Sequence, residues 1–243
     1  MKTVIVIGRG HAGTRAIAQT LLASGVHMGD RLNTSNDLVP AEPMYGACRV
    51  MARHVAHLGD LRWDFSKLHS MPIDEVFNGL VNTFLASVLQ SSRNPRGWKL
   101  PETTLVFPWI ARLFPDAHFI QWVRDPRDAI LGPHVTDDLA DFDIPYDQTD
   151  DMYRQRAISW KYQVDIVAAT PPPKHFTTVR FEDFVLDQER TLQRLETFLE
   201  MPLTRTVVRP EAVGRHRRVD DPPDVTFLLE SMARFGYDNE PSG

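Results

Sequence analysis

The chain has 243 residues, of which 42% are hydrophobic and 24% charged, a composition typical of a folded globular protein and not of a disordered one. No run of about 18 apolar residues is present, so we expect no membrane-spanning helix, and the apolar N-terminus lacks the small-residue exit of a cleavable signal. The single cysteine, Cys48, excludes an internal disulfide framework and a multi-cysteine zinc site, and it favours a reducing, cytoplasmic setting. The net charge of −5 disfavours a nucleic-acid partner.

Strands and helices are predicted to alternate along the chain. The β-branched run Thr3–Ile7 predicts a strand buried on both faces of a parallel sheet, and Thr14–Leu22 predicts the helix that follows it. Residues 30–70 have weak periodicity, with Pro40 and Pro43 as breakers. The other predicted elements are helices over 73–91 and 106–113, a loop over 93–101, a strand over 117–123, a loop over 136–151, a helix over 152–169, a strand over 176–181 and helices over 191–199 and 225–235. This order predicts one doubly wound α/β domain over residues 1–243, with a central parallel sheet flanked by helices.

The segment Gly8–Gly13 matches the pattern G-x-G-x-x-G between a strand and a helix. Glycines let backbone amides approach a phosphate, and the helix N-terminus adds partial positive charge. One hypothesis is therefore an NAD or FAD site, with Asp30 near the position of the expected acidic residue, although the strand before Asp30 is poor. ATP or GTP hydrolysis is disfavoured, because Thr14 and Arg15 stand where a Walker loop has Lys and then Ser or Thr.

Several segments together resemble the sulfotransferases that use 3′-phosphoadenosine 5′-phosphosulfate (PAPS). His11–Arg15 is similar to the family's 5′-phosphosulfate loop, and residues 114–129 are similar to its 3′-phosphate site, where Arg124 ends a strand. Val179–Phe184 resembles the R-Y/F-E-D-L strand end, and Gly214–Arg218 resembles the basic loop that closes over the 3′-phosphate. Trp98-Lys99-Leu100-Pro101 resembles the segment W-K-x-P.

The resemblance implies a fold like that of P-loop nucleoside-triphosphate hydrolases, close to the bacterial and carbohydrate-type branches. It implies PAPS as the sulfuryl donor, 3′-phosphoadenosine 5′-phosphate (PAP) as the product, no required metal, and a hydroxyl or amine of a small molecule or carbohydrate as the acceptor. The oligomeric state is left open. A non-catalytic nucleotide-binding member of the same fold is an alternative, because His11, Arg15 and Gly132 depart from the family pattern.

The resemblance also assigns residues to the nucleotide. They are Arg9, Gly10, His11, Ala12, Gly13, Thr14, Arg15, Arg124, Gly132, Phe181, Arg215, Arg217 and Arg218. Gly132 stands where the family has a serine, and His134 is a substitute donor. Phe181 and Trp98 are the candidates for contact with adenine. The alternatives are a solvated basic patch at residues 215–218 and ion pairs between Arg124 and one of Asp125, Asp128 or Glu182.

Transfer to a hydroxyl or amine needs a general base. Ala41–Tyr45 resembles the E-P-L-Y/W segment of carbohydrate-type sulfotransferases, which makes Glu42 the first candidate, followed by Asp37 and then Glu102. Lys99 is expected to stabilise the bridging oxygen of the leaving group. His11 is expected to take part in catalysis together with Lys99. The alternatives are a helix N-terminal carboxylate for Glu42 and an exposed loop lysine for Lys99.

Overall fold

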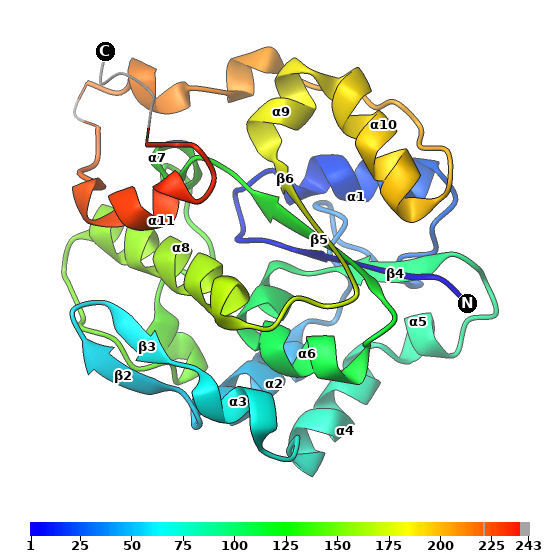
Figure 1. Cartoon of the computed structure of the whole chain (residues 1–243), viewed down its shortest axis with the longest axis horizontal. Helices are drawn as coiled ribbons and strands as arrows, with labels where there is room; N and C mark the ends of the chain where they lie inside the picture. Colours follow the sequence, from blue (N-terminus) through cyan, green and yellow to red (C-terminus); the bar gives the residue numbers. More distant parts are fainter. Residues whose placement is uncertain (221, 239–243) are drawn as a thin grey trace.

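Four parallel strands form the centre of the protein in the order β4-β1-β5-β6 (Figure 1). The computed structural model describes residues 1–220 and 222–238. The middle strands β1 (Thr3–Ile7) and β5 (His118–Val123) are almost entirely buried, and β4 (Arg96–Lys99) and β6 (His175–Arg180) form the edges. The apolar runs in β1 and β5 fit this central position, since both of their faces are covered. The strands predicted near residues 3–7, 117–123 and 176–181 are confirmed.

Helices cover both faces of the sheet, as a doubly wound fold requires (Figure 1). Alternation along β1 directs Val4 and Val6 into one apolar core and Ile5 and Ile7 into the other. The first core is closed by α1 (Thr14–Ala23), α9 (Phe181–Leu186) and α10 (Gln188–Leu199). The second core is closed by α2 (Glu42–Ala52), α4 (Glu75–Phe84), α6 (Phe107–Leu113) and α8 (Met152–Ala169).

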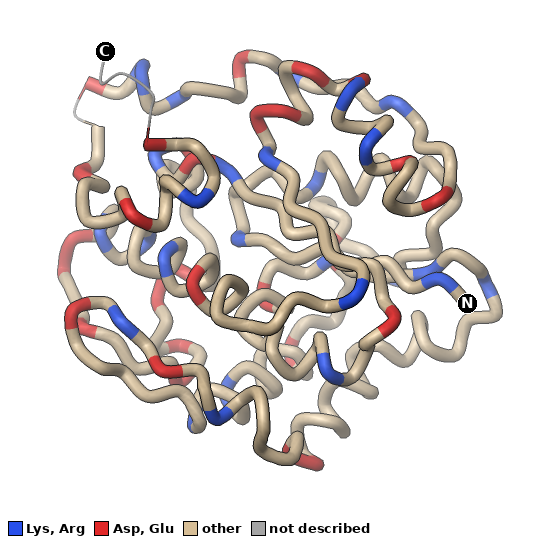
Figure 2. The backbone as a smooth tube through the Cα atoms, in the orientation of Figure 1, with Lys and Arg blue, Asp and Glu red and all other residues tan. Residues whose placement is uncertain are grey.

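Shorter elements connect these layers. They are the hairpin β2 (Ala56–Gly59) and β3 (Arg62–Asp64), the helices α3 (Ser66–Ser70), α5 (Ala86–Leu89), α7 (Pro126–Ala129) and α11 (Leu229–Ala233), and the 3₁₀ turns η1 (Pro101–Val106), η2 (Leu139–Phe142), η3 (Pro210–Ala212), η4 (Arg215–Arg218) and η5 (Thr226–Leu228). Acidic residues recur along the connection that leads into α8 (Figure 2). Among the described residues, no helix combines the length and apolar character needed to cross a membrane.

Three sequence predictions are wrong in detail. The predicted loop over 93–101 contains β4. The sequence pattern does not indicate this strand, because Trp98 is the only large apolar side chain among the four residues of β4. The helix predicted over 73–91 is divided into α4 and α5. Pro43 does not break a helix but lies in the first turn of α2, where its missing N–H has no intrahelical partner to lose.

The pairing of β4 with β1 depends on Gly97, which lies opposite Val4. A Cβ at Gly97 would overlap the backbone carbonyl of Val4, whereas a Cβ at Gly79 on α4 would meet nothing. We therefore predict that Gly97→Ala lowers the free energy of unfolding by about 1–3 kcal/mol through overpacking.

The control Gly79→Ala should raise the free energy of unfolding by up to about 1 kcal/mol, because alanine is the better helix former. Urea unfolding of both variants measures the difference. A Gly97→Ala protein as stable as Gly79→Ala would contradict this account of the edge strand.

Candidate active site

Residues predicted to bind an anion lie close together at the carboxyl ends of three neighbouring strands. The Gly8–Gly13 loop follows β1, Lys99 is the last residue of β4, and Arg124 follows β5. Because the strands are parallel, all three lie at the same edge of the sheet, where ligands of open α/β sheets bind.

Two adjoining cavities open at this edge. The first, here named the nucleotide-side cavity after the expectation from the sequence, has a volume of about 240 Å³ and is lined by Gly10, His11, Gly13, Thr14, Arg15, Ser35, Asp37, Lys99, Pro101, Arg124 and His134. The second, named the acceptor-side cavity after the same expectation, has a volume of about 440 Å³ and is lined by Arg31, Asn33, Asp37, Val39, Pro40, Ala41, Glu42, Tyr45, Leu100, Pro101, Glu102, His134 and Val135. Asp37, Pro101 and His134 line both cavities, so they mark the boundary between them.

The loop after β1 has the geometry of an anion cradle. A Cβ at Gly10 would overlap the ring of His134, and a Cβ at Gly13 would overlap the ring of Phe181. Gly13 has a φ of 83° and caps α1, which has no acidic residue in its first turn. The first N–H groups of an α-helix have no acceptor one turn earlier, and those of Thr14 and Arg15 are not opposed by a carboxylate in the first turn, so they are suited to bind a phosphate.

Arg9 does not line either cavity. Its guanidinium is buried, donates to the carbonyls of Gly10 (3.0 Å) and Ala129 (2.8 Å), and forms an ion pair with Asp137. Burial lowers the pKa of Arg9, an effect that the charge of Asp137 opposes. Asp137 also accepts a hydrogen bond from Arg156 Nε (3.1 Å). Arg9 therefore holds the glycine loop in place from its buried side, away from the two cavities.

Arg124 lies between the glycine loop and the C-terminal part of the chain. Its guanidinium donates to the carbonyl of His11 (3.1 Å), to Asp128 Oδ2 (3.0 Å) and to the carbonyl of Ala212. The guanidinium carbon lies 4.5 Å from the centre of the Phe181 ring, at cation–π distance. The ion pair with Asp128 foreseen as an alternative exists, yet Arg124 still lines the nucleotide-side cavity.

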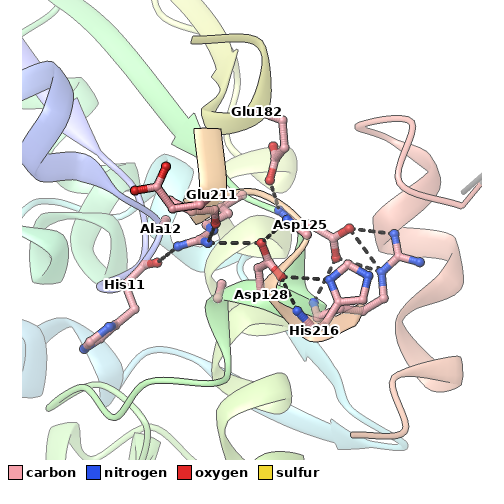
Figure 3. A network of polar contacts seen from close by, with 12 residues as sticks. His11, Ala12, Asp125, Asp128, Glu182, Glu211 and His216 are labelled. Atoms are coloured by element: carbon pink, nitrogen blue, oxygen red, sulfur yellow. Dashed lines mark hydrogen bonds and ion pairs between the residues drawn. The ribbon is translucent and has the colours of Figure 1, made fainter. Parts of the chain in front are cut away.

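The basic segment 214–218 is attached to Arg124 through Asp128 (Figure 3). The backbone N–H of Gly214 donates to Asp128 Oδ2 (2.9 Å), and the backbone N–H of His216 donates to Oδ1 (2.8 Å). The side chains of Arg215, Arg217 and Arg218 are exposed. The segment is thus a fixed turn that carries cations beside the strand end.

A second network supports the turn that begins at Asp125. Glu182 accepts hydrogen bonds from the backbone N–H of Asp125 (3.0 Å; Figure 3) and from the hydroxyl of Tyr237 (2.7 Å). Burial raises the pKa of Glu182. Asp125 in turn accepts two side-chain hydrogen bonds from Arg127 at its Oδ2. The end of the described chain is therefore packed onto the strand end that carries Arg124.

Other predicted residues lie in different surroundings. Trp98 is fully buried and donates to Thr103 (3.2 Å), so it belongs to the core and does not line the nucleotide-side cavity. Gly132 lies so close to His11 that a Cβ there would overlap the imidazole. Phe181 supports Arg124 with its ring.

Lys99 is a buried cation, which makes the alternative of an exposed loop lysine wrong. Its side chain is 2% exposed, forms an ion pair with Asp37 and donates to the carbonyl of Ser35 (2.7 Å). Burial lowers the pKa of Lys99, and the charge of Asp37 opposes that shift. A partly desolvated ammonium of this kind interacts strongly with negative charge that develops nearby.

Glu102 is a buried carboxyl group in the acceptor-side cavity. Its side chain is 2% exposed, and burial together with the charge of Asp37 raises its pKa to about 7. Among the described residues, Glu102 Oε2 has no hydrogen-bond partner. His134 Nε2 lies 3.9 Å from Oε1, and burial lowers the pKa of His134 to about 3, so its imidazole is neutral. By contrast, Glu42 is exposed in the first turn of α2, although it lines the same cavity.

Comparison with known proteins places this site in a family. Residues 4–205 match the sulfotransferase family, and the chain belongs to it. The sulfotransferase domain of the Synechococcus PCC 7002 olefin synthase superposes with a TM-score of 0.58 and 16% identity over 98% of this chain and 95% of that one. The sulfotransferase domain from the curacin biosynthetic pathway gives a TM-score of 0.59 and 12% identity over 98% of both chains. At these identities the likeness concerns the fold.

No curated protein matches the chain. Within residues 1–220 and 222–238, no group of three or more His, Cys, Asp or Glu side chains is arranged to hold a metal ion.

The loop geometry depends on the buried pair of Arg9 and Asp137. Asp137 pairs with both Arg9 and Arg156, so Asp137→Asn leaves two buried guanidinium groups without their shared carboxylate and should lower the free energy of unfolding by about 3–5 kcal/mol. The control Asp141→Asn, at an exposed position nearby, should change it by less than about 0.5 kcal/mol. Thermal or urea unfolding distinguishes the two, and equal effects would contradict the role given to this pair.

Proposed function

We propose that the protein transfers a sulfuryl group from PAPS to a hydroxyl or amine of a small polar molecule or carbohydrate. One observation carries the proposal. A cavity lined by the glycine loop and by Arg124, with the basic segment 214–218 attached beside Arg124 through Asp128, adjoins a second cavity lined by a buried carboxyl group. PAPS has two separated anionic groups, and its transferable group needs an acceptor beside one of them.

The residues present fit the nucleotide. The glycine loop suits the 5′ phosphosulfate, because Gly10 and Gly13 have no side chains that would cover the backbone of the loop. The N–H groups of Thr14 and Arg15 begin α1, which has no acidic residue in its first turn. Arg124 and segment 214–218 suit the 3′-phosphate, since guanidinium groups bind phosphate through paired hydrogen bonds. PAPS supplies an activated sulfuryl group whose departure leaves negative charge on the 5′-phosphate. Lys99 and the N–H groups of α1 are placed to stabilise that charge.

Glu102 is the general base that the geometry favours. A base should be poised near the working pH, and burial raises the pKa of Glu102 to about 7. Its unpartnered oxygen can accept the proton of the acceptor hydroxyl. Asp37 is already engaged by Lys99, and Glu42 is exposed, so both are weaker candidates than the sequence suggested.

The lining of the acceptor-side cavity supports a polar acceptor. Charged and hydrogen-bonding side chains surround it, among them Arg31, Asn33, Glu42, Tyr45 and Glu102. Its volume of about 440 Å³ suits a small molecule. These features favour a polyhydroxylated or amine-bearing acceptor over a long apolar one.

The NAD or FAD hypothesis has less support. Asp30 is 73% exposed and pairs with the nearby His27 at 3.7 Å. It follows an isolated bridge at His27 and not a full strand, so it lacks the placement that ribose recognition requires.

Nucleotide binding provides the first test. In calorimetric titrations with PAP, we expect Arg124→Ala to weaken binding roughly 10- to 100-fold, because hydrogen bonds to charged groups contribute about 1.5–3 kcal/mol. Arg205→Ala, which removes an arginine paired with Glu189 and Glu196 outside the cavities, should bind as the wild type does. Absence of PAP binding, or equal affinity of both variants, would contradict the proposal.

Turnover tests the base. With radiolabelled PAPS and a panel of amino sugars and polyols, Glu102→Gln should reduce kcat by about 100-fold or more while PAP still binds, since general base catalysis contributes about 10²–10⁴. For the wild type, kcat/KM should fall about tenfold per pH unit below pH 7, because the base must be deprotonated.

The matched variant Glu42→Gln should retain most of the activity. Glu102→Gln should also be more stable than the wild type at about pH 8. The pKa of Glu102 is raised from 4.5 to about 7 in the folded state, so the wild type loses stability as pH rises from 4.5 to about 7, where only the unfolded chain is ionised, and the full loss is present at pH 8. Nucleotide binding without turnover on any acceptor would instead favour a non-catalytic member of the family.

A further inference from the structure

Asp128 joins two distant parts of the chain through one buried carboxylate. Its side chain is 1% exposed and lies on α7, four residues after Arg124. Oδ2 accepts hydrogen bonds from Arg124 Nη2 (3.0 Å) and from the backbone N–H of Gly214 (2.9 Å). Oδ1 accepts from the backbone N–H and from Nδ1 of His216, each at 2.8 Å (Figure 3). Arg124 and the turn at 214–216 are thus held by the same group.

These donors are of the kind that binds phosphate. Gly214 has a φ of 69° and a ψ of 31°, and the 3₁₀ turn η4 follows it, so the N–H groups of Gly214 and His216 converge on one anion. Although burial opposes ionisation, the hydrogen bonds from His216 and the charge of Arg124 hold the pKa of Asp128 below its ordinary value. The carboxylate is therefore charged near neutral pH, and it organises the N–H groups of Gly214 and His216 together with one arm of the guanidinium.

We infer that Asp128 is a positioning residue for the 3′-phosphate of the donor nucleotide, an inference that rests on the proposed function. It fixes the Arg124 guanidinium and the turn carrying Arg215 in one arrangement before the nucleotide arrives. Fixing binding groups in advance removes the ordering cost that would otherwise be subtracted from affinity. The carboxylate also repels the bound phosphate, which lowers affinity. The gain in affinity from fixing the binding groups in advance must therefore exceed this repulsion.

A positioning role for Asp128 differs in one measurable way from a role in stabilising the fold alone. A carboxylate that only stabilises the fold would, when neutralised, weaken every adenine nucleotide alike. A carboxylate that positions the 3′-phosphate site affects only nucleotides that carry this group. PAP and adenosine 5′-phosphate differ by the 3′-phosphate alone, so the ratio of their affinities isolates the effect.

The experiment is calorimetric titration of the full chain with PAP and with adenosine 5′-phosphate, for the wild type, Asp128→Asn and Asp125→Asn. We expect Asp128→Asn to lower the affinity ratio about tenfold, equivalent to the loss of one charge-assisted hydrogen bond, through weaker PAP binding alone. Asp125→Asn is the matched control, because Asp125 is a buried carboxylate in the same turn that pairs with Arg127 instead. It should leave the ratio unchanged.

His216→Ala covers the case in which Asp128→Asn fails to fold, because it removes one donor to Asp128 and leaves the carboxylate and the backbone in place. It should lower the ratio about threefold, a smaller loss than that of a full hydrogen bond. An unchanged or increased ratio in Asp128→Asn or His216→Ala, or an equal decrease in Asp125→Asn, would overturn the inference while the proposed function stands. A wild type that does not prefer PAP would overturn both.

Discussion

The rest of the structure depends on three ion pairs that lie side by side. Each joins a buried cation at the end of one of three neighbouring strands to a carboxylate on a connecting segment, and the carboxylate of Asp137 is shared with Arg156. The pairs are Arg9 with Asp137, Lys99 with Asp37, and Arg124 with Asp128. Removing such cations from water is costly, and they persist only where a partner and further hydrogen bonds compensate. Each carboxylate lies outside the strands, so the same pairs that neutralise the cations also fix the connecting segments around the two cavities.

The three pairs differ in what they leave available. Arg9 is fully enclosed and holds the glycine loop, whereas Lys99 and Arg124 still line the nucleotide-side cavity. The net charge of −5 therefore gives little indication of what the site binds, since a ligand responds to the local field and not to the sum over the chain. Beside these cations, Glu102 has no Lys or Arg at bonding distance within the described part of the chain, and burial raises its pKa.

Much of the fold could be predicted from the sequence, because long apolar runs and helical periodicity depend on local pattern; the helix at 152–169 has the predicted bounds. The strand end at Arg124 could be predicted for the same reason. β4 could not, because an edge strand with a single large apolar side chain has no periodic pattern. The burial of Arg9 against Asp137 and the burial of Glu102 could not be predicted either, since burial and pairing arise only from tertiary packing. Asp128 is one of three partners that the sequence offers for Arg124, but nothing local indicates that the same carboxylate binds residues 214–216.

The most direct test of this account is a crystal structure of the protein with PAP bound. We expect the 5′-phosphate to lie in the glycine loop against the N-terminus of α1, the 3′-phosphate to contact Arg124 and segment 214–218, and the 5′ end to face the cavity lined by Glu102. A nucleotide bound with its phosphates exchanged, or bound away from the carboxyl ends of β1, β4 and β5, would contradict it.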